Sequence, residues 1–186
     1  MPRCSDRYRH VQVVSPLDDP PSKAYASRMS GPSRLAVPIA PPATHTLADQ
    51  SFATMLRAAD TGGRYSLMHW LVPIHAGSID VRHRHDRYEE TFLVLQGSLD
   101  FEIDGERLTA EPGIWLRAPA GAAHAYINTG SVDARMLVTF SPGGIEGLFE
   151  EFGDPVDRRG GPSRLESSAM DYIDKARSVH GTEYGI

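Results

Sequence analysis

Between residues 44 and 141 the chain consists of short apolar stretches, each followed by a turn, and this spacing restricts the fold more than any other feature. The stretches include FATMLRA before the turn DTGG, SLDFEI before DGE, and ARMLVTF near the end. Strands of this length, separated by Asp-Gly and Gly-Gly turns, are typical of antiparallel sheets. No helical period interrupts them before Ile145. The pattern therefore predicts an all-β sandwich or small barrel.

Residues 1–43 are interpreted as a proline-rich N-terminal tail. Eight of the 14 prolines lie in this stretch, and proline at such density resists both helix and internal strand. We therefore expect the tail to be poorly ordered, with Met29 as an alternative start of the chain.

The residues after the strands are predicted to form two short helices. Apolar residues recur with helical spacing at Ile145, Leu148, Phe149 and Phe152. A linker follows, and Ser167 or Ser168 is expected to cap a second helix that ends near Gly181. We expect these helices to pad the outside of the barrel rather than carry chemistry. The predicted organisation is a tail over 1–43, a β-barrel over 44–155, and a linker with a C-terminal helix over 156–186.

Charge and cysteine content exclude several classes of protein. With 19 Lys and Arg against 24 Asp and Glu, the net charge is −5, which gives no electrostatic reason to bind nucleic acid or an anionic membrane. The single cysteine, Cys4, cannot form an intrachain disulfide or a zinc–thiolate site. No run of 18 apolar residues exists, and the N-terminus lacks the apolar core of a secretory signal. We therefore expect a cytoplasmic protein.

The segment from Gly77 to Gly97, GSIDVRHRHDRYEETFLVLQG, holds the residues that suggest chemistry. Side chains of a strand alternate between its faces, so His83 and His85 project to the same side, about 7 Å apart along the strand. That spacing suits two positions on one metal ion. A hairpin would bring Glu90 back beside His83, and a third imidazole is available at His124. Glu89 is the rival carboxylate, but the alternation places it on the exposed face.

Three neutral imidazoles and one carboxylate form a mixed nitrogen and oxygen donor set. Such a set suits one divalent transition metal, namely Fe, Mn, Ni, Co or Zn, and has too much nitrogen for Mg or Ca. Four protein ligands leave one or two positions open on a five- or six-coordinate ion. An open position is typical of a catalytic site rather than a closed structural site.

Two motifs within residues 77–128 resemble the two conserved motifs of the cupin superfamily. The first has the spacing GX5HXHX4EX6G and contains Gly77, His83, His85, Glu90 and Gly97. The second has the spacing GX5PXGX2HX3N and contains Gly113, Pro119, Gly121, His124 and Asn128. Fifteen residues separate the motifs, and neither departs from the spacing of the family.

The resemblance implies a jelly-roll β-barrel with a metal held by His83, His85, Glu90 and His124. It extends to the flanks DTGGRYSLMHWLVP and SPGGIEGLFEEFGDP, which look like those of single-domain bacterial cupins, quercetinase-like dioxygenases among them. It thus covers about residues 50–155. Quercetinase-like members bind a flavonol and insert dioxygen, with the ligand carboxylate as base. The resemblance therefore implies a catalytic role for Glu90.

A ligand inside the barrel would contact side chains that otherwise form the core. The residues predicted to be core are Phe92, Val94, Phe101, Ile103, Trp115, Tyr126, Met136, Val138 and Phe140. The residues predicted to line a substrate pocket are Tyr65, Met68, Trp70, Phe92, Phe101, Trp115, Tyr126, Met136 and Phe140. A wall of this kind suits a planar organic substrate.

The other polar residues of interest are given structural roles. His69 and His75 are assigned to a barrel face or a loop, and Asn128 to the orientation of a turn. The remaining histidines, expected to be solvated, are His10, His45 and His180. Arginines expected to face solvent or to pair with the acidic loop are Arg82, Arg84 and Arg87.

Three functions agree with the sequence. The first is a metal-dependent dioxygenase of the quercetinase-like type, in which Glu90 takes a proton from a substrate hydroxyl. The second is a metal-dependent cyclase, isomerase or lyase on an aromatic or polyketide-like substrate, without dioxygen. The third is a non-catalytic module that binds a small molecule. The outward-facing Leu93 and Leu95 favour a homodimer.

Overall fold

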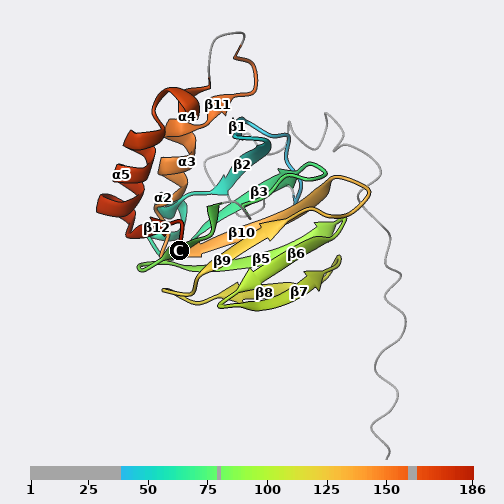
Figure 1. Cartoon of the computed structure of the whole chain (residues 1–186). Helices are drawn as coiled ribbons and strands as arrows, with labels where there is room; N and C mark the ends of the chain where they lie inside the picture. The colour runs from blue at the N-terminus through green and yellow to red at the C-terminus, as the bar shows by residue number, and fades with distance from the viewer. Residues whose placement is uncertain (1–38, 79–80, 159–162) are drawn as a thin grey trace, which may run out of the picture. The chain divides into compact units, whose positions relative to one another are not determined.

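The computed structural model describes residues 39–78, 81–158 and 163–186 (Figure 1). Most of the predicted N-terminal tail, Met29 and Cys4 included, lies outside these residues. The described part is built from two antiparallel sheets with four helices. None of its helices is long and apolar enough to cross a bilayer.

The larger sheet has seven strands. Their spatial order is β11 (Asp154–Pro155), β1 (His45–Leu47), β2 (Gln50–Leu56), β3 (Ser66–Val72), β10 (Ala134–Ser141), β5 (Glu89–Gln96) and β8 (Trp115–Ala118). Neighbouring strands such as β5 and β10 are far apart in the sequence, with Phe92 opposite Val138.

The smaller sheet has five strands. Their spatial order is β12 (Thr182–Tyr184), β4 (His83–His85), β9 (His124–Ile127), β6 (Leu99–Ile103) and β7 (Glu106–Ala110). Strand β12 comes from the C-terminal end of the chain, so this sheet uses residues beyond the barrel segment predicted from the sequence. The predicted domain boundaries stay a prediction.

The inner faces of the two sheets meet in an aromatic core. Residues alternate between buried and partly exposed along β5 and β10, as expected for strands with one face against a core. The ring of Phe92 on β5 lies 5.0 Å from the ring of Phe101 on β6 and 6.1 Å from that of Tyr126 on β9, between centroids. Burial of one such side chain stabilises the fold by about 1.5–3 kcal/mol. The prediction of an all-β jelly roll with short C-terminal helices is confirmed.

The first glycine of the motifs permits a close approach between two segments. Gly77 forms an isolated bridge with Ile127 of β9. A Cβ atom at Gly77 would lie 2.2 Å from the carbonyl oxygen of Tyr126, closer than any side chain allows. Only glycine therefore fits where the chain approaches β9, the strand that carries His124.

The helices are α2 (Ala58–Thr61), α3 (Glu146–Phe152), α4 (Arg164–Ser167) and α5 (Ala169–His180). Figure 1 shows α3, α4 and α5 grouped together beside the sheets. The predicted amphipathic helix is α3, and its apolar residues are buried. The second predicted helix is divided: Ser163 caps α4 through a capping box with Glu166, and Ser168 is the N-cap residue of α5. Gly181, in the left-handed conformation, ends α5 as expected.

The prediction of a buried Trp115 is wrong. Its side chain is 62% exposed. Trp115 lies opposite Leu93 in the pairing of β8 with β5, and Leu93 belongs to the outward set of β5. Paired residues share a face of the sheet, so the register directs Trp115 outward.

Candidate metal centre

The four motif residues that resemble metal ligands come together at one point. His83 and His85 lie on β4, Glu90 on β5 and His124 on β9. Strand β4 pairs with β9 so that His83 is opposite His124. One ligand atom from each of the four residues lies within 4.8 Å of the other three. The two sheets thus bring residues from three strands to the small volume that a single ion needs.

Backbone carbonyls fix two of the three imidazole rings. His83 Nδ1 lies 3.1 Å from the carbonyl oxygen of Val81, and His124 Nδ1 lies 3.0 Å from that of Ala122. A carbonyl oxygen only accepts, so both Nδ1 atoms carry the hydrogen and donate it. The Nε2 atom of each neutral ring then has a lone pair available for a metal.

Glu90 completes the cluster. Its Oε2 atom lies 2.8 Å from His124 Nε2 and 3.1 Å from His85 Nε2. Nδ1 of His124 already carries a hydrogen, so in the neutral ring Nε2 has only a lone pair. This lone pair and the Glu90 carboxylate oxygen, 2.8 Å apart, repel each other unless a cation binds to both. The cation is either a proton on Nε2 or a metal ion. This donor arrangement therefore fits a divalent metal.

Electrostatics within the cluster agree with a cation-binding centre. Burial opposes the charged form of His124, but the hydrogen bond and charge of Glu90 more than offset it and raise the pKa of His124. Burial likewise opposes ionised Glu90, and the hydrogen bonds with His124 and His85 outweigh it and lower the Glu90 pKa. For His83, burial and then the charges of His124 and His85 lower the pKa to about 3. His83 therefore stays neutral, the form that binds metals.

Glu89 lies apart from the cluster. It is partly exposed and forms an ion pair with Arg117 of β8. This places it on the outer face, as the alternation predicts, while Glu90 on the inner face is 6% exposed.

A cavity of about 310 Å³ borders the cluster. Among the residues predicted for a substrate pocket, Trp70, Tyr126 and Phe140 line it, together with His83, His85 and Glu90. Leu47, Ala48, Gln50, Gly77, Ser78, Val81, Val138 and Phe149 also line it. Among the described residues, no lysine or arginine lines this cavity. Its wall is therefore apolar and aromatic, with the charged groups confined to the cluster.

The other predicted pocket residues lie elsewhere. Met68, Phe92, Phe101 and Met136 are buried in the core but do not line the cavity. Tyr65 is 38% exposed, and neither Tyr65 nor Trp115 lines it. Alternation identified the buried face of β5 and β10, but it does not separate core positions from cavity positions.

The C-terminal segment, residues 164–184, forms one side of the cavity. Leu165, Ala169, Tyr172, Ile173 and Tyr184 line it. The C-terminal helices thus border the cavity as well as padding the barrel, and the expectation that they carry no chemistry stays a prediction. A signal was present, because Ala169, Tyr172 and Ile173 have the spacing i, i+3 and i+4 of one helix face.

Two tyrosines of this segment meet inside the cavity wall. The hydroxyl of Tyr184 donates to that of Tyr172 at 2.8 Å. Burial raises the pKa of Tyr172 to about 12, and burial together with Tyr172 raises that of Tyr184 further. Both hydroxyls therefore stay protonated at neutral pH.

Other polar residues have structural roles. Asn128 is buried and donates hydrogen bonds to the carbonyls of Val72 and Val132, so it orients a turn as expected. His180 is 8% exposed and its Nδ1 atom shares a hydrogen bond with the hydroxyl of Tyr88, so the prediction of a solvated His180 is wrong. The expected acidic-loop pairing holds for Arg84, which lies 3.5 Å from Asp86.

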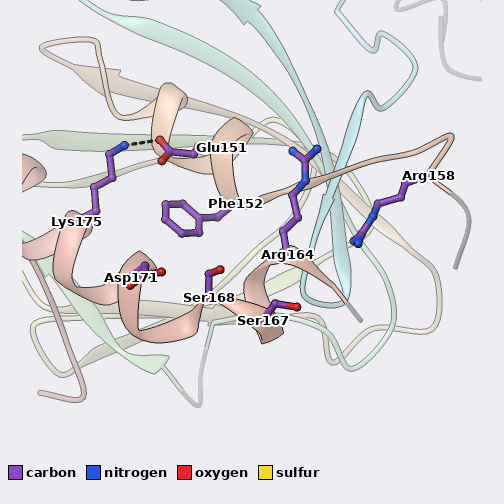
Figure 2. A pocket seen from close by; sticks show the side chains of 8 residues that line it. All are labelled: Glu151, Phe152, Arg158, Arg164, Ser167, Ser168, Asp171 and Lys175. Carbon is purple, nitrogen blue, oxygen red and sulfur yellow. Dashed lines mark hydrogen bonds and ion pairs between the residues drawn. The ribbon is translucent and has the colours of Figure 1, made fainter. Parts of the chain in front are cut away.

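A second hollow of about 480 Å³ lies beside α3, α4 and α5 (Figure 2). Its basic residues are paired within the chain: Lys175 with Glu151, and Arg158 and Arg164 with Asp154. None of its lining residues belongs to the ligand cluster.

The structure has two antiparallel sheets of jelly-roll type with a His₃Glu cluster between them. These features define the class: a jelly-roll β-protein with a candidate metal site. Residues 70–140 match the family model described as Cupin domain, and the resemblance seen in the two motifs is therefore confirmed.

Two curated relatives cover parts of the chain. Quercetin 2,3-dioxygenase of Bacillus subtilis is 31% identical over 93 residues, which are 50% of this chain and 27% of that protein. An uncharacterized protein of Aquifex aeolicus is 36% identical over 63 residues, which are 34% of this chain and 51% of that protein. The chain thus spans about a quarter and about half of the length of these relatives.

A solved structure supports the fold. The crystal structure of a predicted oxalate decarboxylase from Thermotoga maritima has 17% identity and a TM-score of 0.53, and the match covers 58% of this chain and 99% of that one. At this identity the likeness shows the fold alone. The comparisons together establish a cupin fold, and the structure adds a candidate His and Glu metal site.

Proposed function

We propose that this chain is a metal-dependent cupin enzyme, most similar in action to a quercetinase-like dioxygenase, on a small aromatic or enolic substrate. The observation that carries the proposal is that three residues of the His₃Glu cluster, His83, His85 and Glu90, line an apolar, aromatic cavity. The relationship to the Bacillus subtilis quercetin 2,3-dioxygenase supports the same class of reaction.

The cavity selects the substrate by shape and charge. Trp70 and Phe149 meet edge to face with centroids 5.6 Å apart, and Phe140 lies 5.7 Å from Phe149. These rings offer flat apolar surfaces to a planar molecule. Without lysine or arginine among its described lining residues, the wall has no partner for a phosphate or a free carboxylate, so we expect an uncharged ligand.

The cluster residues bind the metal and move one proton. His83, His85, Glu90 and His124 would hold one divalent transition metal (Fe, Mn, Ni, Co or Zn), which supplies Lewis-acid chemistry and, for a redox-active ion, electron transfer. Glu90 faces the cavity and takes the proton of the substrate hydroxyl as a general base. Tyr126 stays protonated, because burial and the charge of Glu90 raise its pKa, and its hydroxyl donates to Gln50 at 2.7 Å.

Oxygen uptake tests the proposal. The protein is loaded in turn with each of the five metals and assayed with flavonols and smaller enols, and we expect substrate-dependent uptake with at least one metal. Glu90→Gln at saturating metal should lower kcat by about 100-fold or more, the usual contribution of a general base. Glu89→Gln is the matched control and should leave kcat unchanged.

Other outcomes assign the site differently. Turnover that is equal without dioxygen would assign the chain to a cyclase, isomerase or lyase on an aromatic or polyketide-like substrate. Tight binding of a small molecule with no turnover under any metal would make it a non-catalytic binding cupin.

The proposal also includes a cytoplasmic homodimer. Leu93 and Leu95 lie on the outer, partly exposed face of β5, where a second copy would cover them. Light scattering after size exclusion tests the dimer, and a monomer at micromolar concentration would contradict it.

A further inference from the structure

Thr182, on the C-terminal strand β12, contacts one of the candidate metal ligands. Strand β12 pairs with β4 so that Thr182 is opposite His85 and Tyr184 is opposite His83. Thr182 is 1% exposed, and its Oγ1 atom lies 2.8 Å from His85 Nδ1. This contact joins residues 97 positions apart in the sequence.

The contact determines how His85 is presented to the metal. The Nε2 atom of His85 faces Glu90 at 3.1 Å, so Nε2 is the atom that would bind the ion and Nδ1 must carry the hydrogen. An acceptor for that hydrogen holds the ring in its orientation and selects the tautomer. For His83 and His124 the acceptors are the carbonyls of residues two positions earlier. For His85, the atom placed to accept the Nδ1 hydrogen is Oγ1 of Thr182.

A second residue of β12 supports the neighbouring ligand. The ring of Tyr184 stacks on that of His83 with centroids 5.5 Å apart and planes 29° apart. Its hydroxyl donates to Tyr172 on α5, and α5 ends at Gly181, directly before Thr182. Helix α5 and strand β12 therefore form one connected support for both histidines of β4.

We propose that Thr182 is a positioning residue of the metal centre, which accepts the Nδ1 hydrogen of His85 and so holds Nε2 toward the ion. The last strand of the chain is then part of the metal site rather than an outer layer. The proposal rests on the metal centre proposed above, and it extends the site to a residue outside both motifs.

Metal affinity of three variants tests it. Dissociation constants for Co²⁺ and Zn²⁺ are measured by competition with a chromophoric chelator on the full chain. Thr182→Val keeps the shape of the side chain but replaces the acceptor Oγ1 with a methyl group. Thr182→Ala removes Oγ1 and puts no group in its place. Both should weaken binding by about 10- to 100-fold, the usual effect of losing such a partner. Thr182→Ser restores the acceptor and should stay within about threefold of wild type by the same reasoning.

A buried threonine elsewhere provides the control. Thr61 is 5% exposed, and its hydroxyl donates to the backbone carbonyl of Ala58, away from the cluster. Thr61→Val should leave the dissociation constant unchanged even if the melting temperature falls. The visible spectrum of the Co²⁺ protein should change for Thr182→Val and not for Thr61→Val, because only the first alters a ligand ring.

The proposal is overturned if Thr182→Val and Thr182→Ala bind the metal as tightly as wild type, or if Thr182→Ser is weakened as much as they are. These results are separate from the test of the enzyme function. Weaker metal binding by the two variants, in a wild-type protein that turns over no substrate, would remove the proposed dioxygenase and keep Thr182 as a positioning residue. Unchanged metal binding by the two variants, in a wild-type protein that is an active dioxygenase, would keep the proposed function and remove the positioning role of Thr182.

Discussion

His124 and His69 are equally buried, at 2% exposure each, but the charges near them have opposite signs. His124 shares the carboxylate of Glu90, which raises its pKa. His69 on β3 has no acidic neighbour of this kind; burial, and then the charge of Arg135, lower its pKa to about 4. Its Nε2 atom has no hydrogen-bond partner among the described residues. Burial alone keeps an imidazole neutral, whereas a nearby carboxylate prepares it for a cation.

The largest effect is expected on metal content, which should fall when His124 is replaced but not when His69 is replaced. His124→Ala removes one of four ligands, and we expect metal binding to weaken by more than about 100-fold, because loss of even an outer partner costs 10- to 100-fold. His69→Ala should retain the metal. Elemental analysis after gel filtration measures both. Equal retention by wild type and His124→Ala would show that the cluster is not a metal site.

Local periodicity and motif spacing predict the cluster of His83, His85, Glu90 and His124, which the structure brings together; its role as a metal site stays a prediction. Alternation distinguished Glu90 from Glu89, and the spacing around His124 identified the third imidazole. The same rule failed at Trp115, because which face of β8 turns inward depends on its register with β5. Periodicity within one strand does not contain that information.

The C-terminal side of the site was not predicted, for a different reason. Strand β12 is three residues long, too short for a periodic pattern. Its pairing with β4 joins segments about 97 residues apart, so no local pattern connects Thr182 with His85. The spacing of Ala169, Tyr172 and Ile173 is that of one helix face, but only the fold shows that this face meets a cavity.

The second prediction uses pH to test the environment of His69. Its folded-state pKa of about 4 is below the unfolded value of 6.5. Neutral His69 therefore contributes stability above about pH 6.5 that is lost as the pH falls toward 4, because only the unfolded chain binds the proton readily. A shift of this size corresponds to about 3 kcal/mol. His69→Gln, which cannot titrate, should lose less stability over the same range.

Urea unfolding at a series of pH values measures this difference. The variant and wild type are compared at each pH, so acid effects from the other histidines cancel. Parallel stability curves from about pH 6.5 to 4 would contradict the assigned environment of His69.

The smallest expected effect concerns His180, which is buried like the other two but has a neutral partner. Burial, and then Lys175 and Arg87, lower its pKa, so it is neutral at pH 7, and its Nδ1 lies 2.9 Å from the Tyr88 hydroxyl. Tyr88→Phe leaves this buried Nδ1 unpaired and should lower the free energy of unfolding by about 1 kcal/mol. Tyr65→Phe, at an exposed tyrosine, should change it by less than about 0.5 kcal/mol.

Urea unfolding at pH 7 measures both, with metal content as a second readout. If Tyr88→Phe instead removed the metal, His180 would belong with His124 as part of the site; an unchanged metal content with lower stability places it with His69, as a buried imidazole of the fold.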